Sequence, residues 1–149
     1  MHIHFVCTGN VYRSRMAEAY LKSFHLPDIQ VSSSGISASN NSNGPISWYA
    51  MRIMFNERLH TLVKPYWNQT TTEHLAKADL VIFMMPMHHT FSKEHFAFQG
   101  DNYEVWNIED VDDMGEVPGE GIDREMQIIR ITEKTYQRIK EKVDRLINE

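Results

Sequence analysis

Residues 4–17, with the sequence HFVCTGNVYRSRMA, decide the fold of this chain. An apolar run ends at Cys7, which is the only cysteine, and a loop containing Gly9 and Asn10 follows it. From Arg13 onward, apolar residues recur at helical spacing. This change of period predicts that a strand leads into a short loop and that the loop leads into an amphipathic helix. A thiol, a glycine-containing loop and a guanidinium therefore lie in one short segment.

The rest of the chain alternates between strand-like and helix-like patterns. The run LVIFMM is continuously apolar, which is typical of a central parallel strand buried on both faces. The predicted strands are 2–7, 29–34, 80–85 and 103–108. The predicted helices are 13–25, 46–57, a short helix that residues 70–72 cap and that ends near 78, 87–96, and a long C-terminal helix from 122. This alternation predicts one open α/β domain, residues 1–149, with a largely parallel sheet.

Composition and charge narrow the classes of function. The 149 residues are 42% hydrophobic and 23% charged, as in an ordinary soluble domain. The net charge of −5 argues against nucleic acid as a partner, because binding to a phosphate backbone needs a surplus of Lys and Arg. No apolar run is long enough to span a membrane, and a single cysteine excludes an internal disulfide. We therefore expect a cytoplasmic monomer with neither a nucleic-acid nor a membrane partner.

Three loops are predicted to meet at one edge of the sheet. In open α/β folds, ligands bind outside the carboxyl ends of the strands. The loops at 8–12, 37–45 and 109–115 each follow a predicted strand, so they should border one cleft. The third loop is acidic and contains Glu109, Asp110, Asp112 and Asp113. This topology places carboxylates near Cys7 and Arg13, although the two groups are far apart in sequence.

The loop at 8–12, which we call the anion loop, has the residue types of a phosphate cradle. Its backbone N–H groups and the dipole of the following helix can hold a phosphate-sized anion. Gly9 and Asn10 accept the left-handed conformations that such a cradle needs, and Arg13 can bind two oxygens of the anion at once. The same positive potential favours the thiolate form of Cys7, which can then attack phosphorus as a nucleophile.

Two further groups complete the predicted chemistry. Ser14, at the start of the helix, can donate a hydrogen bond to the sulfur and ease its later departure. A carboxyl group of the acidic loop can protonate the leaving group as a general acid. Asp110 is the first choice for this acid because it follows the fourth strand most closely. The reaction requires no metal and no cofactor.

The histidines do not suggest a metal site. His2 and His4 share one face of the first strand, but no third ligand stands near them in the sequence. We therefore interpret them as partly exposed histidines of a terminal strand. His88 and His89 are interpreted as ordinary surface or core residues.

The residues around the anion loop resemble the signature of the low-molecular-weight protein tyrosine phosphatases. Cys, five residues, Arg and Ser occur in the order and at the spacing of that family. The other matching residues are Gly9-Asn10, Met16-Ala17-Glu18, Ser34-Gly35, Ala78-Asp79-Leu80, Met84 or Met85, and the acidic loop after Trp106. The similarity therefore covers most of the chain.

This resemblance implies a fold and an activity. The fold is expected to be a single three-layer domain with a four-stranded parallel sheet and helices on both faces. The expected activity is hydrolysis of phosphotyrosine in a phosphorylated protein, and of small aryl phosphates, through a phosphocysteine intermediate with an Asp as general acid. Phosphate- and vanadate-type anions should bind in the same loop. The residues expected to contact the substrate are Thr8, Gly9, Asn10, Val11, Tyr12, Trp48 and Tyr49.

Three positions depart from the family's pattern. The acidic residue is followed by Val111, where the family usually has proline. The candidates for the general acid are therefore Asp110 and, as alternates, Asp112 and Asp113. Tyr12 replaces a second cysteine that is often found there, and Arg15 replaces a proline.

Two other functions fit the same residues. Family members that act on phosphoarginine tend to carry threonine at the position of Val11, so the apolar side chain favours phosphotyrosine and leaves a phosphoarginine phosphatase as the alternative. The other alternative is a module of the same fold that binds phosphate, or carries it on cysteine, without turnover because Asp110 fails as an acid. An arsenate reductase of related fold needs further redox cysteines, which this chain lacks.

Overall fold

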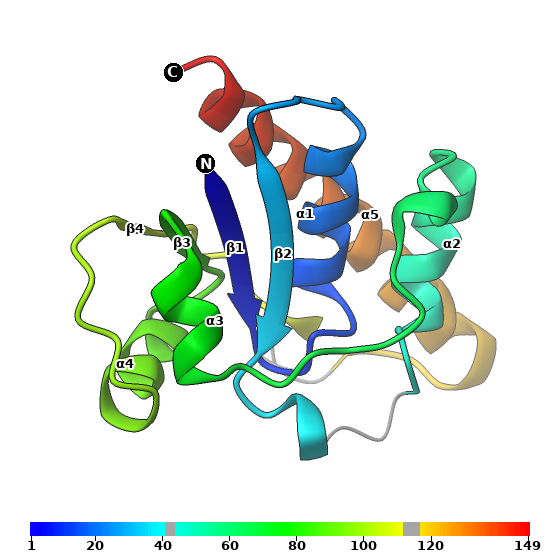
Figure 1. Ribbon diagram of the computed structural model, residues 1–149. Helices are drawn as coiled ribbons and strands as arrows, with labels where there is room; N and C mark the ends of the chain where they lie inside the picture. The colour runs from blue at the N-terminus through cyan, green and yellow to red at the C-terminus, as the bar shows by residue number, and fades with distance from the viewer. Residues whose placement is uncertain (41–43, 112–116) are drawn as a thin grey trace.

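Four parallel strands form one sheet in the order β2-β1-β3-β4 (Figure 1). The computed structural model describes residues 1–40, 44–111 and 117–149. The strands are β1 (His2–Cys7), β2 (Gln30–Gly35), β3 (Leu80–Phe83) and β4 (Tyr103–Val105). Cys7 at the end of β1 lies opposite Gly35, and Val6 lies opposite Phe83. The carboxyl ends of the three longer strands therefore share one edge, as the sequence predicts.

Helices cover both faces of the sheet, which confirms the expected three layers (Figure 1). On one face, α1 (Arg13–Lys22) packs against α5 (Gly121–Ile147), and α2 (Trp48–Asn56) contacts both. On the other face lie α3 (Thr72–Lys77) and α4 (Pro86–His95). Two short 3₁₀ helices, η1 (Ala38–Asn40) and η2 (His60–Leu62), lie in the connections on either side of α2.

The side chains of the central strands alternate between two apolar cores. Phe5 and Ile82 belong to the larger core, which α1, α2 and α5 cover. Val6, Val81 and Phe83 belong to the smaller core on the α3 and α4 face. Because β3 is buried on both faces, it reads as a continuous apolar run in the sequence, whereas β1 has two histidines among its apolar residues. These two strands form the rigid platform from which the edge loops project.

Several elements are shorter than the hydrophobic pattern predicts, among them α1, β3 and β4. α1 ends at Lys22 rather than near 25, because His25 has a φ of 50°, a left-handed conformation that a helix cannot contain. β4 ends at Val105 rather than near 108, because Asn107 has a φ of 57°. β3 ends at Phe83, and α4 begins three residues later.

Gly35 allows the anion loop to lie directly against the end of β2. A Cβ atom at this position would be 2.5 Å from the carbonyl oxygen of Thr8 and 2.7 Å from the backbone nitrogen of Asn10. Both neighbours are backbone atoms, so they cannot move aside as a flexible side chain could. The loop can therefore occupy this position only because Gly35 has no side chain.

His2 is partly exposed, as predicted, but His4 is not. His4 is buried rather than partly exposed, and its ring nitrogens lie 2.6 Å from Ser32 Oγ and 2.7 Å from Ser34 Oγ. Ser32 Oγ also lies 2.6 Å from His2 Nε2. The sequence interpretation of His4 was wrong because β2 supplies serines on the same face of the sheet. Their hydroxyl groups form hydrogen bonds with both ring nitrogens and so allow the ring to be buried. Among residues 1–40, 44–111 and 117–149, no group of three His, Cys, Asp or Glu side chains could hold a metal ion.

Burial of His4 predicts a specific dependence of stability on pH. Burial, reinforced by nearby positive groups such as His74, lowers the pKa of His4 from 6.5 to about 3. The unfolded chain therefore binds the proton more readily than the folded chain. The contribution of neutral His4 to the free energy of unfolding is fully present above pH 6.5 and is lost as the pH falls toward 3. We expect the free energy of unfolding to fall by about 2 kcal/mol, through His4 alone, when the pH is lowered from 7 to 5. Urea unfolding at these two pH values measures this change.

The variant His4→Gln should lose this part of the pH dependence, whereas His25→Gln, at an exposed position, serves as the control. A pH dependence that is the same in His4→Gln as in the wild type would contradict the assignment.

Candidate active site

Asn10 fixes the conformation of the anion loop. Its φ is 54°, and its side chain is fully buried. The side-chain nitrogen donates to Ser14 Oγ at 2.8 Å and to Ser33 Oγ at 2.9 Å, and the side-chain oxygen accepts from the backbone nitrogen of Asn68 at 2.8 Å. These bonds tie the loop to α1, β2 and the segment before α3. The loop therefore holds its shape through contacts that a glycine at this position could not make.

The sulfur of Cys7 lies beneath this loop with two donors directed at it. Ser14 Oγ is 2.9 Å from Cys7 Sγ, and the backbone nitrogen of Asn10 donates to the same sulfur at 3.3 Å. Because Ser14 Oγ accepts a hydrogen bond from Asn10, its own proton is available for the sulfur. This arrangement suits a sulfur that carries negative charge.

Arg13 connects the anion loop to the segment that follows β4. The guanidinium is buried, and its Nη1 donates to the carbonyl oxygen of Ile108 at 2.9 Å. Its Nη2 donates to Thr8 Oγ1 at 3.3 Å and lies 3.7 Å from Asp110 Oδ2. The structure thus brings Arg13, at the start of α1, next to Asp110, as the topology predicts. Asp112 and Asp113, the alternates for the general acid, lie outside the described residues.

A cavity of about 280 Å³ opens beside Asp110. It is lined by Val11, Tyr12, Ser47, Tyr49, Asp110, Val111, Arg124 and Ile128. Tyr49 donates a hydrogen bond to Glu125 Oε2 at 2.6 Å, which joins α2 to the first turn of α5. Trp48 does not line this cavity; its ring stacks on Tyr49 with centroids 4.4 Å apart, and 54% of its surface is exposed. Of the two aromatic residues, Tyr49 is therefore the one that lines the cavity.

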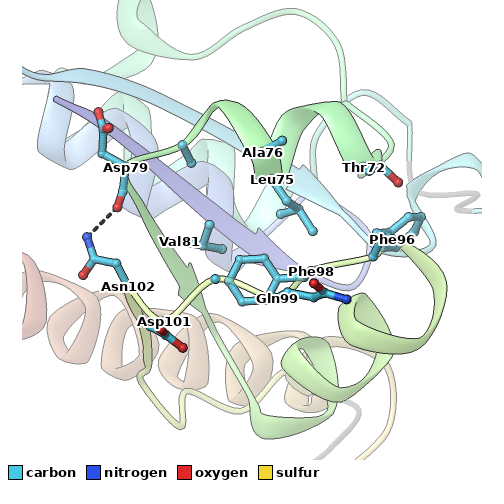
Figure 2. Close-up of a pocket in the computed structure, with 13 residues that line it drawn as sticks. Thr72, Leu75, Ala76, Asp79, Val81, Phe96, Phe98, Gln99, Asp101 and Asn102 are labelled. Atoms are coloured by element: carbon cyan, nitrogen blue, oxygen red, sulfur yellow. Dashed lines mark hydrogen bonds between the residues drawn. The ribbon is translucent and has the colours of Figure 1, made fainter.

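A larger cavity, of about 340 Å³, lies away from the anion loop (Figure 2). Figure 2 shows Leu75, Val81 and Phe98 around it, with Asn102 bonded to the carbonyl oxygen of Asp79. Asp79 precedes β3 and Asn102 precedes β4, so this cavity is at the amino ends of the strands. None of the candidate residues lines it.

Tyr12 anchors the anion loop to the C-terminal helix. It is buried, and its hydroxyl donates to Thr132 Oγ1 at 2.7 Å. Thr132 in turn donates to the carbonyl oxygen of Ile128 at 2.8 Å. Burial raises the pKa of Tyr12, so the phenol stays neutral and remains a donor at physiological pH. The replacement of a cysteine by Tyr12 thus supplies a structural contact with α5.

Arg15 holds three chain segments together behind the anion loop. Its side chain is buried, and Nη1 donates to the carbonyl oxygens of Asn10 at 3.1 Å and Pro45 at 2.9 Å. Nη2 donates to the carbonyl oxygen of Lys64. A buried cation is stable here because backbone carbonyls solvate it. Arg15 thereby fixes the anion loop relative to the segments that border it.

His88 belongs to the site, although the sequence interpretation placed it among ordinary surface or core residues. Its ring is buried above the loop, with Nε2 2.9 Å from Thr8 Oγ1. Met85 donates its backbone N–H to His88 Nδ1 at 3.0 Å. The one feature of the sequence that could have indicated this role is that the histidine lies in the first turn of a helix that starts at Pro86. Hydrophobic periodicity could not show which way this ring points.

Comparison with known proteins agrees with this geometry. The chain matches the family model of the "Low molecular weight phosphotyrosine protein phosphatase" over residues 2–149. It is 36% identical over 117 residues to the low molecular weight protein-tyrosine-phosphatase PtpB of Staphylococcus aureus, covering 78% of each chain. It is also 35% identical over 100 residues to a protein-arginine-phosphatase of Bacillus subtilis, covering 65% of this chain and 64% of that protein.

The fold is also similar to that of solved structures. Wzb of Vibrio vulnificus, in complex with benzylphosphonate, superimposes with a TM-score of 0.72 over 97% of this chain and 95% of that chain. The sequence identity is 20%, so this similarity bears on the fold alone.

Proposed function

The chain belongs to the low molecular weight phosphotyrosine protein phosphatase family, and we propose that Cys7, Arg13 and Asp110 carry out its hydrolysis of phosphotyrosine through a phosphocysteine intermediate. The observation that carries this proposal is the position of Cys7 Sγ. It lies below a loop whose shape the buried side chain of Asn10 fixes, with the Ser14 hydroxyl 2.9 Å away, and Arg13 joins this loop to Asp110. On this proposal the nucleophile lies at the base of the loop, and the acid lies beside the anion-binding guanidinium.

In the first step, the sulfur of Cys7 attacks phosphorus, so that an S–P bond forms as the bond to the tyrosine oxygen breaks. Asp110 donates its proton to the departing phenolate. Arg13 and the backbone N–H groups of the anion loop hold the phosphoryl oxygens, where negative charge is greatest. In the second step, Asp110 takes a proton from water, the water oxygen attacks phosphorus, and the S–P bond breaks. Ser14 stabilises the thiolate that is released.

The position of Asp110 supports its role as the acid. Its Oδ2 is 3.7 Å from Arg13, and its Oδ1 accepts the backbone N–H of Val111 at 2.8 Å. A carboxyl group at this position borders both the anion loop and the cavity beside it. This placement favours turnover over a module that only holds phosphate, because it puts a carboxyl group beside the guanidinium that would hold the phosphoryl group.

The cavity lining supports phosphotyrosine as the substrate. Val11 contributes an apolar surface, and Tyr12 and Tyr49 contribute rings, so that the walls suit a flat aromatic leaving group. The similarity to an arginine phosphatase makes phosphoarginine the alternative substrate. The apolar Val11 side chain offers no hydrogen bond to a guanidinium, which favours the aryl ester.

We further propose that the protein acts as a monomer in the cytoplasm and that its loop binds phosphate and vanadate. The single cysteine supports a reducing compartment. In the part of the chain that the structure describes, the helices are too short or too polar to cross a membrane.

The first test compares phosphotyrosine and phosphoarginine peptides of the same sequence. We expect a higher kcat/KM for the phosphotyrosine peptide, inhibition by vanadate and activity in the presence of a chelator. Cys7→Ser should lower kcat by roughly 10⁴-fold or more, since the nucleophile is lost. Released inorganic phosphate measures all of these rates. Faster cleavage of the phosphoarginine peptide would make phosphoarginine, and not phosphotyrosine, the substrate. Full activity of Cys7→Ser would exclude the mechanism.

A second test concerns the general acid. Asp110→Asn should lower kcat for phosphotyrosine by about 10²-fold to 10³-fold. The loss should be smaller for para-nitrophenyl phosphate, whose leaving group needs less protonation. Glu109→Gln, at the exposed neighbouring position, is the matched control. A larger loss in Asp112→Asn or Asp113→Asn than in Asp110→Asn would assign the acid to another residue.

A further inference from the structure

The hydroxyl group of Thr8 is held by two donors at the start of the anion loop. His88 Nε2 lies 2.9 Å from Thr8 Oγ1, and Arg13 Nη2 donates to the same oxygen at 3.3 Å. Arg13 Nη2 is also 3.7 Å from Asp110 Oδ2. The Thr8 hydroxyl is therefore on the side of the loop that faces the proposed acid.

The tautomer of His88 follows from its other contact. The backbone N–H of Met85 donates to Nδ1 at 3.0 Å, so Nδ1 carries no proton. Burial, with the charge of Arg13 adding to it, lowers the pKa of His88 to about 3, so the ring is neutral at physiological pH. The one ring proton is then on Nε2, and His88 donates it to Thr8.

This arrangement determines what the Thr8 hydroxyl can do. A hydroxyl oxygen has two lone pairs and one proton, and here N–H groups of His88 and Arg13 occupy both lone pairs. Thr8 can therefore act only as a donor. Within the described ranges, the Thr8 hydroxyl accepts two hydrogen bonds and donates none to a protein acceptor. Its proton is thus available to an anion held in the loop.

We propose that the Thr8 hydroxyl donates a hydrogen bond to the bound phosphoryl group, and that His88 is the positioning residue that directs this donor. The inference rests on the proposed function, because it needs an anion in the loop. A donor that is already oriented loses no hydrogen bond and needs little reorganisation when the anion arrives. His88 contributes without touching the substrate, since it only fixes which way the Thr8 proton points.

The test measures binding of inorganic phosphate by isothermal titration calorimetry, which needs no turnover. Thr8→Val should bind phosphate roughly tenfold more weakly, as expected for one lost hydrogen bond to a charged group. Thr8→Ser keeps the hydroxyl and should bind like the wild type. Equal phosphate affinity in Thr8→Val and the wild type would overturn the proposal.

A double-mutant cycle separates positioning from a merely structural role. His88→Leu should weaken phosphate binding about threefold alone and should have no further effect when combined with Thr8→Val. His88→Gln, which retains a donor, should recover part of the loss. His89→Leu on the same helix is the matched control, because the His89 ring stacks on Tyr103 of β4, with centroids 4.1 Å apart. An equal effect of His88→Leu in both backgrounds would contradict the positioning role.

Thermal unfolding identifies any variant that does not fold. If His88→Leu is unfolded, His88→Gln and the two Thr8 variants still decide the question. A wild-type protein that binds phosphate but hydrolyses no phosphoester would overturn the proposed function alone. A wild-type protein that binds no phosphate would overturn both proposals.

Discussion

The site depends on one buried amide, the side chain of Asn10. A residue with a φ of 54° is unfavourable for most side chains, and here it is held by hydrogen bonds to Ser14, Ser33 and the backbone of Asn68. The same conformation brings the backbone nitrogen of Asn10 to 3.3 Å from the sulfur of Cys7. The anion loop therefore has its working shape before any anion binds, which is how catalysis by oriented dipoles avoids reorganisation.

Three further side chains connect the anion loop to the rest of the molecule through hydrogen bonds. Arg15 joins the loop to the segments around Pro45 and Lys64, and Tyr12 joins it to α5 through Thr132. Arg13 joins it to the segment after β4 through the carbonyl oxygen of Ile108. The residues that replace a cysteine and a proline of the family pattern are thus both buried and hydrogen-bonded. They support the loop through contacts between distant segments.

Much of the fold could be predicted from the sequence, because the continuous apolar run of β3, the apolar residues at the end of β1 and the period of α1 and α5 are local signals. The ends of α1 and β4 were missed, since His25 and Asn107 adopt left-handed conformations that hydrophobicity does not encode. Cys7, Arg13 and Ser14 could be grouped because they share one segment. The contact of His88 with Thr8 could not be predicted, because it depends on how α4 docks on the sheet. The role of Asp110 stays a prediction.

The central claim is that Cys7 is the nucleophile and carries the phosphoryl group during turnover. The most direct measurement is peptide mass spectrometry after rapid mixing of Asp110→Asn with para-nitrophenyl phosphate and a denaturing quench. Hydrolysis of the intermediate is slow in this variant, because its water lacks a base. The account predicts one phosphoryl group on the peptide that contains Cys7, attached to sulfur and lost during a chase without substrate. Phosphate on Ser14, or turnover with Cys7 never modified, would contradict it.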